Sequence, residues 1–513
     1  MIDVTALLRA YALTRARHWS RSNSKETQEA VLLSLLQRAK FTTFGREHGF
    51  ASLRSVSDYQ QAVPLRTYED FWSLYWKDSF PTITNVTWPG TYKYFAVSSG
   101  TSSGTTKYIP YTPEMSRSNA KAGLDLLSFH VLNNPLSQIL GGKNFMLGGS
   151  TEMKYEAPHV WSGDLSGISV REMPAWLKPW YFPPEHLALL KDWEEKIDVL
   201  ARESLKVDVR LLGGVPSWLL IFIDHLSKIS GKSRRLKDLY PGLEMLVHGG
   251  VNFAPYKEQF DLLLEGSSAE LREVYPASEG FIAMADRGYG EGLRLGEDRG
   301  IFFEFVPREE LASECPTRHW VGTIEPGIEY AIVLSTCAGL FSYVIGDTVR
   351  FVQTDLPRLL VTGRTSYYLS AFGEHVIAEE LEDAVAFAAH SLNLLVNDFS
   401  VGAVFPSSPG ELGHHAYYIE FAGVTPSPEK ANQFSELVDK KLCARNEDYE
   451  AHRAEGFGLA APVIVPTPPG FFSEWMRSRG KLGGQNKVPR IIAREALFSE
   501  LRSFAEQFDQ NSL

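Results

Sequence analysis

The chain has 513 residues, of which 44% are apolar and 22% charged, a balance typical of a globular protein with enough apolar material for large buried cores. Its formal net charge is −11, from 51 basic and 62 acidic side chains. This charge argues against a nucleic-acid-binding protein, which needs a basic surface to displace counterions from phosphates.

Three features bear on where the protein resides. The arginine-rich start, residues 1–22, resembles a transit peptide but lacks the unbroken apolar core of a secretory signal, and we expect an amphipathic first helix instead. Cys315, Cys337 and Cys443 are far apart and odd in number, which argues against a disulfide framework and favours a reducing compartment. The longest apolar run, Trp218–Ile223, is too short to span a bilayer. We therefore expect a cytoplasmic protein.

Helical and strand-like patterns alternate through most of the chain. Thr112-Pro113-Glu114 places a cap, a proline and an acid where a helix should begin, and apolar residues recur after it as far as Val131. Helices are also expected at Lys191–Leu205 and Ser217–Lys228. The alternation predicts an α/β domain with mixed sheets. The expected strands are Tyr94–Val97, Phe145–Leu147, Val209–Leu212, Met245–Val247, Ile301–Val306 and Ile328–Leu334.

From Thr365 onward the pattern changes to that of a small α+β domain of about 150 residues, a common domain size. We therefore divide the chain into a large domain, 1–364, and a small one, 365–513, with a hinge near Thr365. The elements expected in the small domain are helices at Ile377–Ala389 and Pro428–Leu442 and strands near Ser400–Phe405, Ala416–Phe421 and Val463–Val465.

A run of serine, threonine and glycine follows the first expected strand and ends in Lys107. Glycines allow backbone N–H groups to point at an anion, hydroxyls add donors, and the lysine adds a charge, so the run favours a phosphate site. It is not a Walker loop, because no G-K-[ST] closes it. From this segment alone, a loop without a ligand remains an equal alternative.

The same run contains Gly100-Thr-Ser-Ser-Gly104, which fits the G-x-S-x-G pattern of hydrolase nucleophile elbows, with Ser102 as nucleophile. His248-Gly-Gly250 resembles the oxyanion motif of esterases. It follows Ser102 by 146 residues, whereas in that fold it precedes the serine. A serine hydrolase is therefore the weaker alternative.

Three downstream motifs add charged residues in a fixed order. VYPASE, residues 274–279, ends a strand with a carboxylate, and YVIGD, residues 343–347, places an aspartate after an expected tight turn. Thr362-Gly-Arg364 follows. Taken singly, these residues read as a solvated acid, a turn residue and a surface arginine.

With the serine-glycine loop, the order of these motifs resembles the adenylate-forming superfamily that includes firefly luciferase and acyl-CoA synthetases. Within it, the chain is most similar to the Gretchen Hagen family of acyl-acid amido synthetases, in their bacterial form. The likeness runs from about Thr43 to Arg490, nearly the whole chain. Further matching segments are FGREHGF (44–50), VPLRTYEDF (63–71), GVPSW (214–218) and QNKVPR (485–490).

The resemblance implies an adenylate-forming enzyme fold, with mixed β-sheets flanked by helices and a β-barrel-like part in the large domain and a mobile small domain. The serine-glycine loop would grip the β- and γ-phosphates of ATP, and two further segments would flank the adenine and the acyl carboxylate. The implied nucleotide-binding residues are Ser98, Ser99, Gly100, Thr101, Ser102, Ser103, Gly104, Lys107, Gly249, Gly250, Val251, Tyr275, Pro276, Ala277, Ser278, Asp347 and Arg364.

Three catalytic residues are implied in the same way. Glu279 would bind Mg²⁺, a hard cation suited to a carboxylate oxygen. Arg364 would reach the ribose or the α-phosphate, and Lys487 would stabilise charge at the α-phosphate. Asp347 would accept hydrogen bonds from the ribose hydroxyls. Two departures weaken the match: the arginine that plant enzymes usually carry in the YVIGD segment is missing, and Lys481 is a second candidate lysine.

The implied reaction is ATP-dependent activation of a carboxylic acid, with release of pyrophosphate, and transfer of the acyl group to the amine of an amino acid. Its partners would be small molecules, with no nucleic acid and no membrane. The sequence does not fix the oligomeric state, for which a monomer is the expectation. The alternatives are a ligase with a thiol acceptor, either CoA or a carrier's phosphopantetheine, and a nucleotide-binding regulator without catalysis.

Overall fold

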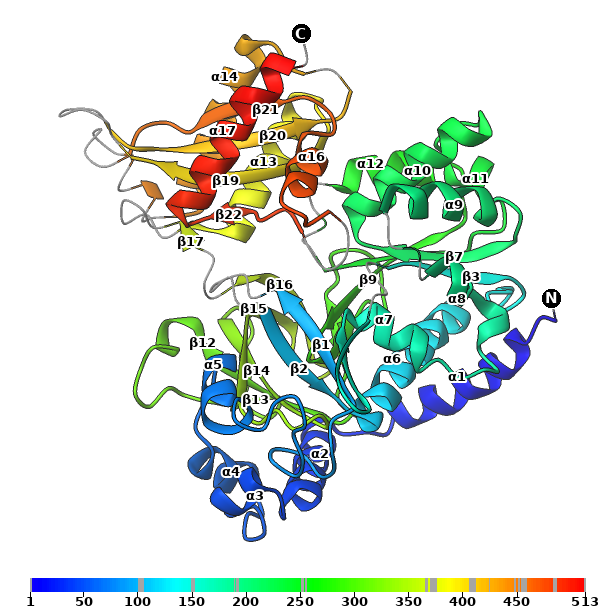
Figure 1. The fold of residues 1–513 in the computed structure, drawn as a ribbon, viewed down its shortest axis with the longest axis vertical. Helices are drawn as coiled ribbons and strands as arrows, with labels where there is room; N and C mark the ends of the chain where they lie inside the picture. Colours follow the sequence, from blue (N-terminus) through cyan, green and yellow to red (C-terminus); the bar gives the residue numbers. More distant parts are fainter. Residues whose placement is uncertain are drawn as a thin grey trace. The chain divides into compact units, whose positions relative to one another are not determined.

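The structure is a computed structural model that describes residues 2–99, 106–148, 153–188, 190, 193–250, 253, 256–364, 368–369, 376–405, 412–423, 425–446, 449–450, 453, 459–482 and 487–511. The chain divides into two compact units (Figure 1). The first unit contains Met1–Gly250 and Leu264–Val361, and the second contains Val251–Leu263 and Thr362–Leu513.

Most strands of the first unit belong to one twelve-stranded mixed sheet, in which β6, β3, β7, β8 and β9 run parallel to one another. A smaller sheet has the order β2 (Thr106–Tyr111), β1 (Tyr94–Ser99), β5 (Val160–Gly163) and β4 (Met153–Ala157). In spatial order, the large sheet contains β13 (His319–Trp320), β12 (Ile301–Pro307), β14 (Glu329–Thr336), β15 (Tyr343–Gln353), β16 (Arg358–Arg364), β11 (Leu293–Leu295), β10 (Gly280–Met284), β9 (Glu270–Ala277), β8 (Met245–Gly249), β7 (Val209–Gly214), β3 (Lys143–Leu147) and β6 (Tyr181–Phe182).

The helix that begins the fold, α1 (Thr5–Trp19), packs along α6 (Pro113–Asn133) (Figure 1). Arg15 of α1 is buried and donates to Asp125 of α6 over 2.7 Å and to Asp298 over 2.8 Å. The arginine-rich start is thus part of the fold. The other helices of this unit are α2 (Ser24–Ala39), α3 (Thr43–Glu47), α4 (Val56–Ala62), α5 (Tyr68–Phe71), α7 (Leu165–Arg171), α8 (Glu185–Ala188), α9 (Trp193–Ser204), α10 (Pro216–Ser230) and α11 (Leu236–Leu239).

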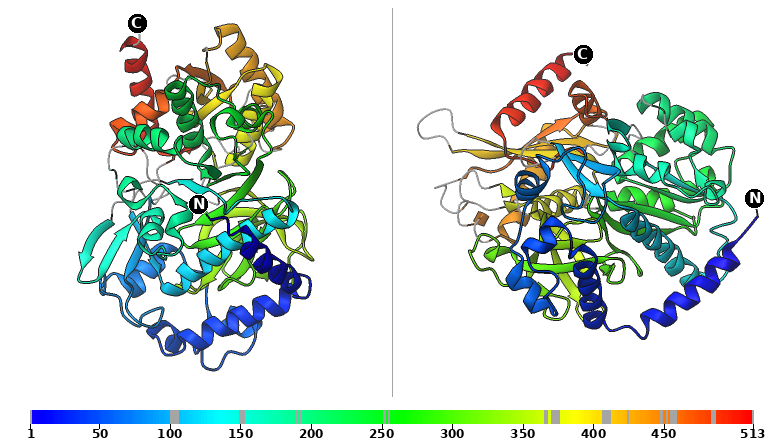
Figure 2. Two further views of the ribbon diagram at one scale, coloured as in Figure 1. Left: turned by 90° about the vertical axis from the view of Figure 1, so that its right-hand side faces the viewer. Right: turned by 60° about the horizontal axis from the view of Figure 1, so that its bottom comes forward.

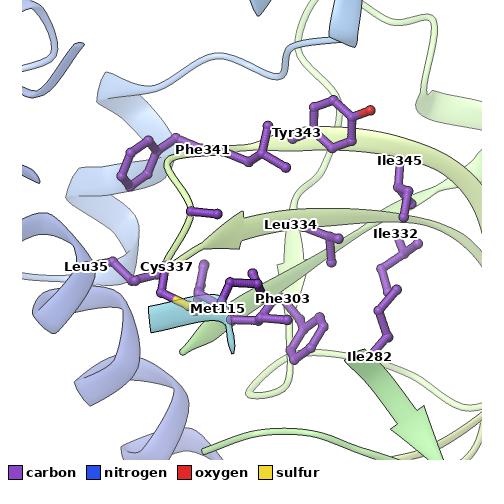
Figure 3. Close-up of a cluster of buried hydrophobic side chains, with 14 of the residues drawn as sticks. Leu35, Met115, Ile282, Phe303, Ile332, Leu334, Cys337, Phe341, Tyr343 and Ile345 are labelled. Atoms are coloured by element: carbon purple, nitrogen blue, oxygen red, sulfur yellow. The ribbon is translucent and has the colours of Figure 1, made fainter. Parts of the chain in front are cut away.

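A large apolar core holds the antiparallel strands of the first unit together. Its side chains come from helices and strands far apart in the sequence, among them Leu35 of α2, Met115 of α6 and Phe303 of β12 (Figure 3). Tyr343 extends from β15 at the edge of this cluster, beside Ile345. The core therefore fixes the start of β15, which carries one of the motifs singled out by the sequence.

In the second unit, helices cover both faces of a four-stranded sheet (Figure 2). Alternate residues of a strand point to opposite faces. Accordingly, Tyr417 packs with α13 (Ala378–Ser391) and α14 (Pro428–Cys443), and Tyr418 packs with α16 (Phe471–Ser478) and α17 (Glu495–Asn511). The helix α12 (Lys257–Leu264) lies largely in this unit. The sheet has the order β21 (Val463–Thr467), β20 (His414–Phe421), β19 (Val396–Val404) and β22 (Ile491–Ile492), and a separate pair is β17 (Tyr368–Leu369) with β18 (Val376–Ile377).

The α/β class and the mixed sheets expected from the sequence are confirmed. Each expected strand lies in or overlaps an observed strand, and α6 begins as predicted, with the Thr112 hydroxyl accepting from the Met115 amide over 3.1 Å. One local expectation was wrong: Asp347 lies within β15 rather than after a tight turn. Among the described helices, none is long and apolar enough to cross a membrane.

Candidate active site

The parallel strands β7, β8 and β9 end at one edge of the large sheet, where Gly214 is paired with His248 and Gly249 with Val274. The carboxyl edge of parallel strands is a common place for ligands. A Cβ atom on Gly249 would lie 2.2 Å from the Val274 carbonyl oxygen, so only glycine allows β8 to approach β9 this closely. Gly250 follows with φ +85°, a left-handed conformation that favours glycine.

Glu279 lies in the two-residue connection between β9 and β10, since Ala277 and Gly280 are paired on either side of it. Its carboxyl is 7% exposed and accepts a hydrogen bond from the Tyr343 hydroxyl over 3.0 Å. Burial raises the pKa of Glu279, and the Tyr343 hydrogen bond opposes that rise. The charges of Asp347 and Lys107 also act on this pKa, which they raise and lower respectively.

Asp347 is presented by a β-bulge in β15. The pairing of β15 with β14 shifts register between Val344 and Thr348, and Gly346 within the bulge has φ +91°, a left-handed conformation that favours glycine. The Asp347 carboxylate accepts a hydrogen bond from the Tyr275 hydroxyl of β9 over 2.5 Å. The bulge therefore aims this carboxylate at β9.

The contact between Tyr275 and Asp347 also shows how the sheet is shaped. Three strands, β16, β11 and β10, lie between β15 and β9, so a flat sheet would separate their backbones by about 19 Å. Two side chains that are 2.5 Å apart require the sheet to curl at this point. The curl brings together two motifs that are dispersed in the sequence, VYPASE and YVIGD, because Glu279 and Tyr343 also meet across it.

The serine-glycine loop connects the two strands of an antiparallel hairpin, in which Ser98 is paired with Lys107 and Ser99 with Thr106. A nucleophile elbow instead turns from a strand into a helix, so this geometry argues against the hydrolase alternative. Lys107 is half-buried, with its ammonium 5.5 Å from the centre of the Tyr68 ring. Gly100, Thr101, Ser102, Ser103 and Gly104, and also Val251, lie outside the described residues.

Arg364, Lys487 and Lys481 belong to the second unit, whereas Pro276, Ala277 and Ser278 lie in the first, directly before Glu279. Arg364 is the last residue of β16. Lys487 is exposed and comes shortly before an anchored segment, in which the Pro489 carbonyl accepts from the Ser400 hydroxyl over 2.6 Å. Arg490, which donates to Tyr256 over 2.7 Å and pairs with two buried acids, holds this segment against β19. Lys481 is exposed as well, beyond the end of α16.

Sequence reasoning assigned no role to Tyr343 or Tyr68, and it named Tyr275 as a nucleotide-binding residue without finding the contact of its hydroxyl with Asp347. Tyr343 supports Glu279, Tyr275 supports Asp347, and Tyr68 lies beneath Lys107. Tyr275 and Tyr343 were visible as members of their motifs. No pattern in a single sequence shows which side chain they reach across the sheet.

Comparison with solved structures first defines the class of fold. The chain is similar to a GH3.15 acyl acid amido synthetase, with a TM-score of 0.79 at 20% identity, over 96% of this chain and 95% of that one. It is also similar to 2-hydroxyisobutyryl-CoA ligase in the postadenylation state, with a TM-score of 0.61 at 12% identity, over 94% and 92%. The chain therefore has the fold of the adenylate-forming ligases.

Three models of one family match the chain in order: the GH3 family N-terminal domain at residues 18–157, the central domain at 297–364 and the C-terminal domain at 379–496. The chain belongs to the GH3 family, as its motifs had led us to expect.

Curated relatives of the chain include two from Arabidopsis thaliana, the indole-3-acetic acid-amido synthetases GH3.3 and GH3.4. Both are 26% identical to it, over 206 and 273 residues respectively. These matches cover 37% and 47% of this chain and 33% and 45% of the relatives. A probable indole-3-acetic acid-amido synthetase GH3.9 from Oryza sativa subsp. japonica is 28% identical over 208 residues, 37% of this chain and 46% of the relative. The matches thus span less than half of each of these relatives.

Proposed function

We propose that the protein is an ATP-dependent acyl-acid amido synthetase. It joins a carboxylic acid to AMP with release of pyrophosphate, then transfers the acyl group to the amine of an amino acid and releases AMP. The observation that carries this proposal is the pair of contacts Tyr275–Asp347 and Tyr343–Glu279, which join two dispersed motifs, VYPASE and YVIGD, at one curled part of the sheet. Family membership supports the same reaction, since the curated relatives are named amido synthetases.

Each polar group at the site has a task in this chemistry. A carboxylate reacts poorly with amines because its oxygen is a poor leaving group, and attachment of AMP corrects this. Asp347, oriented by Tyr275, would accept hydrogen bonds from the ribose hydroxyls of ATP. Lys107 and the backbone of the serine-glycine loop would hold the β- and γ-phosphates. The acid's oxygen and the α-phosphorus would then be aligned, which supplies much of the rate enhancement.

Glu279 fits the proposed Mg²⁺ ion. It is a buried carboxylate whose ionised form is disfavoured by burial, and a bound cation would relieve that penalty. No group of three or more potential metal ligands occurs in the part of the chain that the structure describes. A single carboxylate suffices, because Mg²⁺ is commonly held by one or two carboxylates together with substrate phosphates. When bound, the ion would neutralise charge on the phosphates.

The two half-reactions place different demands on the site, and we assign them to a mobile second domain. Pyrophosphate leaves in the first half-reaction and AMP in the second, and a lysine that assists the first would crowd the incoming amine. A hinge near Thr365, between domains 1–364 and 365–513, would deliver Lys487 in only one of its positions. Arg364, at the end of β16, would reach the ribose or the α-phosphate. The enzyme would act in the cytoplasm, as a monomer, on small molecules alone.

Pyrophosphate exchange with a broad panel of carboxylic acids tests this proposal. At least one acid should support exchange, and product analysis with amino acids and with CoA then decides between an amide and a thioester. If no acid supports exchange, while an ester is hydrolysed and Ser102→Ala abolishes that hydrolysis, the proposal is wrong and the protein is a serine hydrolase.

A further inference from the structure

A small cavity lies beside the proposed nucleotide site, within the first unit. Its polar lining consists of His248 of β8, Glu273 of β9 and Tyr289, and its apolar lining includes Leu271 and Leu293. The cavity measures about 10 Å³, which is room for a single water-sized group. Three polar side chains therefore line a space that one small polar group could fill.

The register of the sheet places two of these groups side by side. His248 and Glu273 are direct partners in the parallel pair of β8 and β9, so their backbones are about 4.8 Å apart and their side chains point to the same face. His248 is 1% exposed. Burial lowers its pKa to about 3, so the imidazole is neutral.

The environment of Glu273 is unusual for a carboxyl. Within the described residues it makes no side-chain hydrogen bond or ion pair, whereas Glu270, three residues earlier on the same strand, binds both His130 and Arg272. Burial raises the pKa of Glu273 to about 7. A partly buried carboxyl without a partner costs folding free energy, which argues for a use outside folding.

The cavity is also in the right place to meet the acid substrate. Glu273 and Tyr275 are two residues apart on β9, so they point to the same face and are separated by about 6.6 Å along the strand. Tyr275 supports Asp347, which is assigned to the ribose in the proposed function. His248 directly precedes Gly249 and Gly250, which were assigned to the adenine and the acyl carboxylate. The end of the acid remote from its carboxylate would therefore reach Glu273.

We propose that Glu273 and His248 form a polar subsite that selects acids carrying a hydrogen-bond donor, a hydroxyl or an amino group, remote from the carboxylate. This inference rests on the proposed function. The water-sized cavity would take the donor group alone, and the carbon skeleton of the acid would lie outside it. An acid without the donor would leave the Glu273 carboxyl unpaired in the complex, and a site built to bind a hydroxyl discriminates strongly against such an analogue.

The test compares matched acids by pyrophosphate exchange at saturating ATP: benzoate, 4-hydroxybenzoate, 4-(aminomethyl)benzoate, 3-phenylpropionate and 3-(4-hydroxyphenyl)propionate. For the wild-type protein, kcat/KM should favour a donor-bearing acid over its parent by about 10- to 100-fold. Glu273→Leu should abolish that preference. Glu273→Gln keeps an acceptor oxygen without the charge, so it should keep the preference for a hydroxyl and lose the preference for an ammonium group.

A matched control is Glu265→Gln, which changes an exposed carboxylate of the same unit and should leave every ratio unchanged. Melting temperatures report whether each variant is folded. If Glu273→Leu does not fold, the near-isosteric Glu273→Gln still tests the subsite through its loss of the preference for an ammonium group. The subsite would be overturned if the wild type showed no preference for donor-bearing acids. It would also be overturned if both Glu273 variants kept the full preference of the wild type. Absence of exchange with every acid would instead overturn the proposed function, and the subsite with it.

Discussion

Replacing Tyr343 by phenylalanine would remove one hydroxyl from the proposed metal-binding site and leave the ring in the core. That hydroxyl donates to Glu279 over 3.0 Å, and the carboxyl it reaches is only 7% exposed. Burial raises the pKa of Glu279, and the Tyr343 hydrogen bond is the largest effect that opposes it. In Tyr343→Phe the burial penalty therefore remains, while its main compensation is lost.

The expected shift in the pH dependence of adenylation follows from the energy of a hydrogen bond to a charged group, about 1.5–3 kcal/mol. Since ~1.4 kcal/mol corresponds to one pH unit, the acid limb of kcat/KM for adenylation should move up by about one to two pH units. The variant should then lose roughly 10- to 100-fold on the acid side of that limb and recover as the pH rises above it. It should also need more Mg²⁺ for half-maximal rate at neutral pH.

The same change should lower the stability of the fold, and by more at high pH than at low pH. A buried carboxyl with a raised pKa costs folding free energy above its folded pKa and none below its unfolded value. Because Tyr343→Phe raises this cost, its melting temperature should fall further below that of the wild type at pH 8 than at pH 4. Pyrophosphate exchange and thermal unfolding across pH measure the two effects.

Tyr240→Phe is the matched control. The Tyr240 hydroxyl is buried and lies 2.6 Å from the Ser204 hydroxyl, away from every residue assigned to the site. Its loss should cost stability without moving the acid limb. The reasoning would be refuted by a Tyr343→Phe enzyme that is active and folded but keeps the wild-type acid limb and Mg²⁺ dependence.

Three further outcomes are expected. Asp347→Ala should slow pyrophosphate exchange by about 30- to 1,000-fold, from the loss of ~2–4 kcal/mol of ribose hydrogen bonds, with a nearly unchanged apo melting temperature; early unfolding would make Asp347 structural. Burial lowers the pKa of His130, but its hydrogen bonds to Glu244 and Glu270 outweigh burial and raise the pKa overall. The charged imidazole therefore stabilises the fold below pH ~6.5, and this stabilisation is lost as the pH rises through the folded pKa. In urea unfolding, His130→Gln should therefore cost about 3 kcal/mol at pH 6 and clearly less at pH 9, and equal losses would contradict this. Lys487→Ala should cripple adenylation yet barely slow attack of an amine on a supplied acyl-adenylate, whereas Lys481→Ala should affect neither; the reverse pattern would transfer the role to Lys481.

Local patterns were enough to predict most elements of the fold. A cap, a proline and an acid mark the start of α6 because each satisfies or tolerates an orphan N–H group at a helix start, and the structure shows Thr112 in that role. Runs of apolar residues marked β8 and β12 because strands in large sheets are buried on both faces. The short β11 and β22, with three and two residues, carry too little pattern to be found.

The site was predictable to the extent that its residues lie in short motifs. Glu279 and Asp347 could be named from their motifs, but their partners could not, because Tyr343 and Tyr275 are 64 and 72 residues away in the chain. Each contact depends on the curl of the large sheet, and that curl results from the packing of many strands. A single sequence contains no record of which strands pair or how strongly the sheet bends.

The sequence placed Asp347 after a tight turn because it does not show how strands pair. The observed position of Asp347 also has a consequence for the proposed mechanism. A glycine before an aspartate fits a tight turn and a β-bulge equally well, and only the pairing with β14 decides between them. A turn would have ended the strand at Asp347. The bulge re-aims the carboxylate while β15 continues to Gln353 and β16 returns to Arg364, crossing the boundary between the two units after Val361. The neighbouring strands β15 and β16 thus carry Asp347, the proposed ribose ligand, and Arg364, which directly precedes the proposed hinge near Thr365 in the sequence.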